Sequence, residues 1–168
     1  MYQKNMLKIT RAGNVCIDIR LIECLFLADH GKAKKFLMNC NQPIVNYVSS
    51  QKDIRTIIIT SSNTVYTSDI KVKTLNDKLL DQGIDLLCIV GSKAYIPVNH
   101  IEAMIDFDQE QEEPYIPIFI EDKATSNTGQ VIRSFVRMQS GHTYPSTFNQ
   151  HTLIKKAENK SVSTVFRG

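Results

Sequence analysis

The chain of 168 residues is long enough for one compact domain, or for a domain with an appended segment. It is 42% hydrophobic and 22% charged, which excludes a chain disordered by composition, and no apolar run approaches the roughly eighteen residues of a membrane span. The first residues carry no apolar signal core, so we expect a cytoplasmic protein without a membrane partner. Four widely spaced cysteines without a CxxC pair predict reduced core thiols and no zinc or other cofactor.

The net charge of +3 is unevenly distributed along the chain. Residues 1–105 carry +4, residues 106–122 carry −7 and residues 123–168 carry +6. The basic C-terminal part would fit a polyanion, and it would equally fit the acidic segment of a neighbouring molecule.

The first half of the chain predicts strands with one helix among them. Segments rich in apolar and β-branched residues predict strands at 7–10, 14–19, 21–28, 44–49 and 54–60. Apolar residues at helical spacing from Ala33 to Cys40 predict a helix that ends before Pro43. Turn residues at 61–63 predict that 64–69 pairs back as a hairpin.

The second half continues this pattern. Thr74 and Asp77 resemble a capping box that opens a helix at 75–82, which Gly83 ends. Strands are predicted at 85–90, 93–98, 101–107, 115–120 and 161–166, and a helix at 148–160. The segment 115–120 would lie at a sheet edge because Pro117 cannot donate to a ladder, and 131–138 fits helix and strand equally.

These elements predict a mainly β fold of the α+β class, with antiparallel sheets or a small sandwich and two or three short helices. We expect a β core at 1–107 and a C-terminal extension at 108–168 that holds an acidic loop and a basic tail.

A strand, a polar corner and a second strand occur twice. Moving the sequence by 79 places "VCIDIRLIECLF" on "AYIPVNHIEAMI", where three of the twelve aligned residues are identical. An internal repeat would explain this match, and so would the shared chemistry of two strand corners. At the second corner we expect Ile96, Val98 and Ile101 to face the core, and Ser92 and Lys93 to lie outside.

The stretch 54–107 resembles the core of LytTR-type DNA-binding domains, mostly β domains of bacterial transcription regulators. "VKTLNDKLLDQ" stands where that family has a helix of the "LKELEEKL" kind, and "KAYIPVNHI" stands where it has "SYIVNLNHI". "IDIRLIECLFLAD" is similar to the family's first strand. The family's His-Arg-Ser is Gly91-Ser92-Lys93 here and its first Asn is Pro97, so the resemblance implies the fold without the same DNA readout.

The stretch 13–79 also resembles, without gaps, the small bacterial matrix-gene regulators of the RemA type. "GNVCIDIRLIECL" is similar to their "GNIVSANRIVAIV", and Arg55 matches the arginine of their "TR", whereas Lys52-Asp53 replaces an arginine pair. This resemblance implies an oligomeric ring that binds DNA along a basic rim. Neither resemblance covers residues 108–168.

DNA binding needs lysines and arginines that converge on phosphates, with polar side chains that reach base edges. The candidates are strand-end and loop residues: Arg55, Lys71, Lys73, Ser92 and Lys93. The alternative is that these charges are solvated and protect strand edges from aggregation.

No HExxH, GxSxG, P-loop or GxGxxG motif occurs, and the four histidines lack metal-ligand spacing, so we expect a non-enzymatic protein with no small-molecule substrate. The sequence favours a DNA-binding regulator or nucleoid-type protein that works as an oligomer. The alternative is a structural subunit of a larger ring or particle, for example a phage virion part with other assembly proteins as partners. In either case, oppositely charged residues would join copies: Glu110, Glu112, Glu113, Arg133 and Arg137.

Overall fold

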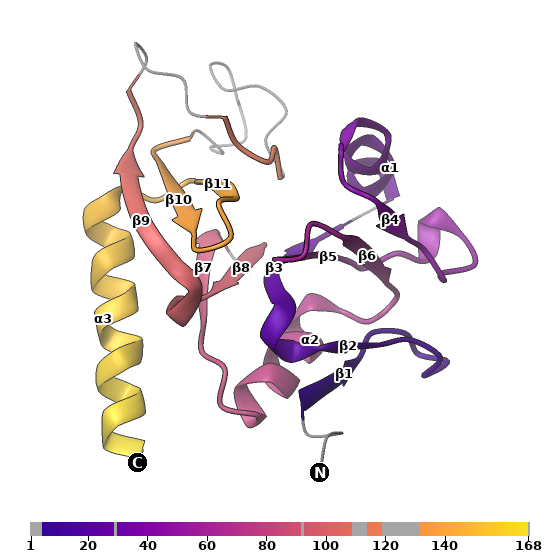
Figure 1. Ribbon diagram of the computed structural model, residues 1–168, viewed down its shortest axis with the longest axis horizontal. Coiled ribbons are helices and arrows are strands. Elements are labelled where there is room, and N and C mark those ends of the chain that lie inside the picture. The colour runs from indigo at the N-terminus through magenta and orange to yellow at the C-terminus, as the bar shows by residue number, and fades with distance from the viewer. Residues whose placement is uncertain (1–4, 29, 92, 109–113, 119–131, 168) are drawn as a thin grey trace.

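The computed structural model describes residues 5–28, 30–91, 93–108, 114–118 and 132–167. The fold is mainly β with three α-helices in the described part of the chain, which confirms the predicted α+β class (Figure 1). The helices are α1 (His30–Asn39), α2 (Val72–Asp81) and α3 (Gln150–Arg167). The strands are β1 (Met6–Lys8), β2 (Cys16–Asp18), β3 (Ile22–Leu27), β4 (Ile44–Val45), β5 (Thr56–Thr60), β6 (Val65–Ser68), β7 (Leu86–Val90), β8 (Ala94–Pro97), β9 (Ile101–Asp106), β10 (Ser134–Met138) and β11 (Thr143–Ser146).

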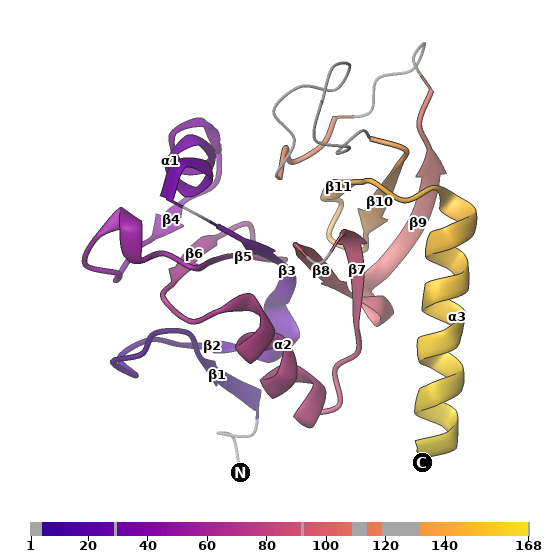
Figure 2. The same cartoon turned by 180° about the vertical axis from the view of Figure 1, so that it is seen from behind.

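The described strands form three sheets. The largest has the order β4-β6-β5-β3-β8-β7, and only its outer β4–β6 pair is parallel. A three-stranded antiparallel sheet has the order β11-β10-β9, and β1 pairs with β2. Helix α3 runs along β9, and α1 lies at the opposite side of the molecule (Figures 1 and 2). Because β9 pairs with β10, the C-terminal part of the chain completes a sheet begun within residues 1–107.

The order of elements in the chain repeats. The corner between β2 and β3 is the 3₁₀ turn η2 (Ile19–Leu21), and the corner between β8 and β9 is the 3₁₀ turn η4 (Val98–His100), 79 residues later. The β5–β6 hairpin followed by α2 is matched, 78 residues later, by the β10–β11 hairpin followed by α3. We call residues 6–81 the first repeat and residues 86–167 the second repeat.

The repeat extends to individual residues. Aligning 54–79 with 132–157 matches 26 positions, of which eight are identical: Ile54/Ile132, Arg55/Arg133, Ser62/Ser140, Tyr66/Tyr144, Ser68/Ser146, Thr74/Thr152, Leu75/Leu153 and Lys78/Lys156. Hydrogen bonds repeat as well: Thr56 Oγ1 donates to the Ile70 carbonyl at 2.7 Å, and Ser134 Oγ donates to the Phe148 carbonyl at 2.6 Å. Of the two explanations for the repeated corner, the structure supports an internal repeat.

Both hairpin turns need the left-handed backbone at the same repeat position. Asn63 has φ 68° there, and Gly141 has φ 96°. Glycine and asparagine adopt this conformation at the least cost in free energy. The two repeats can therefore form the same turn although one has asparagine and the other glycine at this position.

The core contains residues from both repeats. The β-branched residues of β5 are buried on both sides of the sheet. On one side α2 packs Leu75 and Leu79, one helical turn apart, against the β1–β2 hairpin and β3. On the other side Cys24 and Phe26 of the first repeat join Leu87, Ile96 and Leu153 of the second. The two repeats therefore share one core.

The second corner agrees in part with its prediction. Ile96 is fully buried, whereas Val98 and Ile101 are half-buried and pack against the same cluster. Lys93 is half-buried rather than fully outside, and Ser92 lies outside the described residues.

Three element predictions are wrong. Helix α2 begins at Val72 after Lys71 and has no side-chain cap, so the Thr74–Asp77 capping box does not form. Residues 161–166 continue α3 instead of forming a strand. Their β-branched residues have only a weak preference against helix, and adding residues to an existing helix is easier than starting a new element. Of the predicted edge strand at 115–120, the described part is not a strand, although the Ile116 amide donates to the Thr143 carbonyl at 2.9 Å, beside β11. The ambiguous segment 131–138 contains β10.

Candidate functional site: a buried carboxylate where the repeats meet

A glutamate lies in the middle of the shared core. Glu23 is the second residue of β3, and its neighbours along the strand are apolar. Only 1% of its surface is exposed. A carboxylate removed from water is costly unless hydrogen-bond donors replace the lost water.

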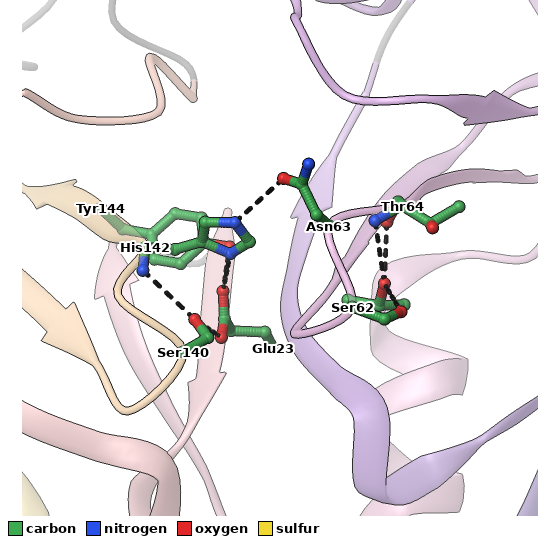
Figure 3. A network of polar contacts seen from close by, with 8 residues as sticks. Glu23, Ser62, Asn63, Thr64, Ser140, His142 and Tyr144 are labelled. Atoms are coloured by element: carbon green, nitrogen blue, oxygen red, sulfur yellow. Dashed lines mark hydrogen bonds and ion pairs between the residues drawn. The ribbon is translucent and has the colours of Figure 1, made fainter.

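The second repeat supplies these donors from one hairpin, β10–β11. Tyr144 Oη donates to Glu23 Oε1 at 2.7 Å, and Ser140 Oγ donates to Oε2 (Figure 3). His142 Nδ1 lies 2.5 Å from Oε1. The tautomer of the imidazole decides which of these two atoms is the donor. Three side chains of the second repeat thus meet one carboxylate of the first.

The far side of the His142 ring faces the other hairpin. His142 Nε2 lies 3.1 Å from Asn63 Oδ1, at the tip of the β5–β6 turn. The His142 side chain is 18% exposed, so the ring lies at the rim of the network. A hydrolytic triad would place a nucleophilic hydroxyl or thiol at Nε2. Here Nε2 meets an amide, and Ser140 donates to the carboxylate instead. This arrangement joins the β5–β6 hairpin to the β10–β11 hairpin through the His142 ring.

Burial keeps the phenol of this network protonated. Desolvation raises the pKa of Tyr144 well above its usual value, and the nearby Cys24 and Glu23 raise it further. Burial likewise raises the pKa of the Cys24 thiol. Tyr144 is therefore a neutral donor to Glu23 throughout the physiological range.

Replacing Tyr144 by phenylalanine should lower the free energy of unfolding by about 1–3 kcal/mol, because a buried carboxylate loses one of its donors. Urea denaturation measures this change. The matched control is Tyr66→Phe at the equivalent position of the first repeat, where the ring is half-buried; measured at a concentration where the protein is monomeric, the expected change is within about 0.5 kcal/mol. Equal effects of the two substitutions would contradict a specific role for the Tyr144 hydroxyl.

Several of the predicted DNA-binding residues lie together at one end of the six-stranded sheet, where β3 ends. The Leu27 amide donates to the Lys93 carbonyl at 2.7 Å, and the next amide, of Ala28, donates to the Arg55 carbonyl at 2.9 Å. Lys71 directly follows Ile70 in the sequence. The Ile70 carbonyl accepts from the side chain of Thr56, which directly follows Arg55. The backbone thus brings Arg55, Lys71 and Lys93 to the same end of the sheet.

Further charged residues lie around this group. The Arg55 guanidinium donates to the Lys52 carbonyl at 3.0 Å, and the Arg11 amide donates to Asp69 Oδ1 at 2.7 Å. We call Arg11, Lys52, Arg55, Lys71 and Lys93 the cationic end. One carboxylate of this region, Asp69, contacts Arg11, and another, Asp53, directly follows Lys52 in the sequence. Lys73 is exposed in the first turn of α2, close in sequence to Lys71.

The predicted contacts between copies are only partly described. Glu110, Glu112 and Glu113 lie outside the described residues. Arg133 is exposed just before β10, and Arg137 is half-buried within it. Arg133 occupies the position in the second repeat that Arg55 occupies in the first, so each repeat carries an arginine before its hairpin.

A cavity of about 330 Å³ opens between α1 and the segment 114–118. Its lining combines apolar side chains with two lysines: Phe26, Phe36, Tyr115, Ile116, Lys32 and Lys35. It is therefore a second place where segments of the two repeats approach each other.

The sequence contained the signals for the buried network, although reading one motif at a time missed them. The alignment of the corners already pairs Glu23 with Glu102, and the second alignment pairs Ser62 with Ser140 and Tyr66 with Tyr144. The burial of only one glutamate of this pair is a tertiary fact that local sequence does not contain.

Comparison with protein-family models, with curated proteins and with solved structures finds no match to this chain. In the described part of the chain, every helix is too short or too polar to cross a lipid bilayer.

Proposed function

We propose that the chain is a non-enzymatic DNA-binding protein that works as a homo-oligomer, either as a transcription regulator or as a nucleoid-type protein. The observation that carries this proposal is the cationic end, where backbone hydrogen bonds hold Arg55 and Lys93 beside the last residues of one strand. Cations fixed at strand ends can contact successive phosphates, because the sheet sets their spacing.

The fold suits this role in a second way. Arg55 and Lys71 are exposed and belong to the first repeat, and the equivalent position of the second repeat carries Arg133. Each added copy of the chain would add a further cationic end to the assembly. Multiple weak phosphate contacts on a single assembly give strong binding by effective concentration.

Salt dependence tests this proposal directly. The protein should bind a DNA duplex of arbitrary sequence with an affinity that falls steeply with salt. The triple variant Arg55→Ala, Lys71→Ala, Lys73→Ala should reduce the slope of log K against log salt by about 0.9 for each phosphate that the protein no longer neutralises. Fluorescence anisotropy over a range of salt concentrations measures this slope.

The control is Lys155→Ala, which removes an exposed lysine of α3 and should leave the slope unchanged. Absence of DNA binding at low salt would overturn the proposal, and an unchanged slope in the triple variant would move the interface elsewhere.

A structural subunit of a ring or particle is the second candidate. The specific observation in its favour is the outer edge of β9: among the described residues, β9 pairs with β10 on one side and with no strand on the other. A sheet edge of this length favours addition of a further strand. An assembly that remains large in sedimentation without DNA, and that does not bind DNA at low salt, would support this candidate over the first.

A further inference from the structure

The two equivalent strands β3 and β9 have different surroundings. Five of the six residues of β3 are buried, whereas every residue of β9 is half-buried or exposed. The reason is that β3 pairs with β5 on one side and with β8 on the other, while β9 pairs with β10 alone. The second repeat covers the first, and among the described residues of a single chain no strand occupies the equivalent place beside the second.

Every second residue of β9 points its backbone groups toward that place. The Phe107 amide donates to the Arg133 carbonyl, which directly precedes β10. Backbone groups alternate in direction along a strand, so Ile105, two residues earlier, also points its amide and carbonyl toward β10. Met104 therefore points its amide and carbonyl the other way. Its carbonyl accepts from the side chain of Gln150, at 2.7 Å, instead of from a neighbouring strand.

Glu102 is the equivalent of Glu23 but is exposed. The residues that satisfy Glu23 come from the second repeat's hairpin, and their counterparts in the first repeat are Ser62, Thr64 and Tyr66. Serine and tyrosine are therefore retained at the same positions. Ser62 is exposed at the turn, and Tyr66 is half-buried. Within one chain these residues and Glu102 do not meet, and the Ser62 hydroxyl bonds to Thr60 Oγ1 at 2.8 Å instead.

The other half of this surface is the β1–β2 hairpin, the counterpart of the β7–β8 hairpin that covers β3. Met6 of this hairpin is 40% exposed, and so is Leu21 of the turn η2 that follows it. Cys16 is exposed and Val15 is half-buried, whereas Ala94, the counterpart of Val15 at the existing junction, is fully buried.

We propose that the β1–β2 hairpin of a second copy pairs with β9, so that copies join head to tail by repeating the contact that β8 makes with β3. The register follows from that contact. Leu25 pairs with Tyr95 and Phe26 with Ala94, so Met104 pairs with Cys16 of the next copy and Ile105 with its Val15.

Ser62 and Tyr66 of the next copy then donate to Glu102, and the carboxylate is buried as Glu23 is. Contacts of this kind use two different surfaces of each chain, so they close into a ring or continue as a filament. The inference rests on the proposed assembly into oligomers and is independent of DNA binding.

An engineered disulfide tests the register. Residues directly opposite each other in an antiparallel pair have Cβ atoms about 4.5–5.5 Å apart, close enough for a disulfide to form with a small backbone adjustment. The variant Met104→Cys should therefore cross-link to the native Cys16 of the next copy under mild oxidation. A non-reducing gel should show a ladder of covalent multimers, because every chain carries both partners.

Two control variants define the result. Met104→Cys combined with Cys16→Ser should lose the ladder, and so should Ala103→Cys, whose side chain points to the opposite face of β9. If Met104→Cys is misfolded by circular dichroism, the pair Ile105→Cys and Val15→Cys in a Cys16→Ser background replaces it.

Light scattering of the unmodified protein distinguishes failure of the proposed junction from failure of the proposed oligomer. Oligomers without a Met104–Cys16 cross-link would overturn this junction and leave the proposed oligomer standing. A monomer at micromolar concentrations and low salt, without cross-links, would overturn both. A ladder that persists in the Cys16→Ser control would also overturn the junction, since another thiol would then be responsible.

Discussion

Replacing Glu23 by alanine should lower the free energy of unfolding by about 3 kcal/mol or more, because each buried polar group left without its hydrogen-bond partner costs about 1–3 kcal/mol. The carboxylate is 1% exposed and bonds to Ser140, His142 and Tyr144, so its loss leaves three polar groups of the second repeat without their partner. The expected loss is a large part of the stability of a chain this size.

The matched variant is Glu102→Ala, which removes the equivalent but exposed carboxylate. Measured by urea denaturation at a concentration where the protein is monomeric, it should change stability by no more than about 0.5 kcal/mol. A small effect of Glu23→Ala would mean that the network contributes little to holding the repeats together. A large effect of Glu102→Ala in the monomer would show that the two glutamates have similar surroundings, contrary to the structure.

Ile22→Ala should cost about 2–5 kcal/mol, because Ile22 is 1% exposed and truncation leaves a cavity between β3 and the β1–β2 hairpin. Its counterpart Ile101, at the start of β9, is half-buried, so Ile101→Ala should cost less in the monomer. Thermal or urea unfolding of both variants at low protein concentration provides the comparison.

At concentrations where copies associate, Ile101→Ala should lower the free energy of unfolding by nearly as much as Ile22→Ala does. The reason is that a hairpin of the neighbouring copy would cover Ile101 as the core covers Ile22. Equal costs in the dilute monomer would contradict the open edge of β9.

Local patterns in the sequence were sufficient for most of the elements. The β-branched run of β5 and the apolar spacing of α1 are strong signals because one segment contains all the information. The helix α2 was predicted from a capping box that does not form, and only its end before Gly83 was marked by a residue that acts as expected. At 161–166 the local pattern gave a wrong prediction. "SVSTVF" contains strand-forming residues, but it continues the helix α3, whose first turns are packed into the core through Leu153.

The candidate site was harder to predict, because it depends on which segments pair. Charge and position identified Arg55, Lys71 and Lys93, and the structure places these three at one end of the sheet. The Glu23 network was missed, since its members are separated by more than a hundred residues. Only the comparison of the two repeats as a whole indicates that Ser140 and Tyr144 have a common partner.

The pairing of β3 with β8 also has a consequence for the order in which the chain is made. During synthesis β3 emerges long before β8, and until β8 follows, the edge of β3 is as open as that of β9. At this stage the β3 strand of a nascent chain can form with a neighbouring chain the hydrogen bonds that it later forms with its own β8. On a polysome, where several such chains lie close together, the β7–β8 hairpin of one molecule can therefore complete the sheet of another, and the exchanged pair has as many hydrogen bonds as two separate molecules.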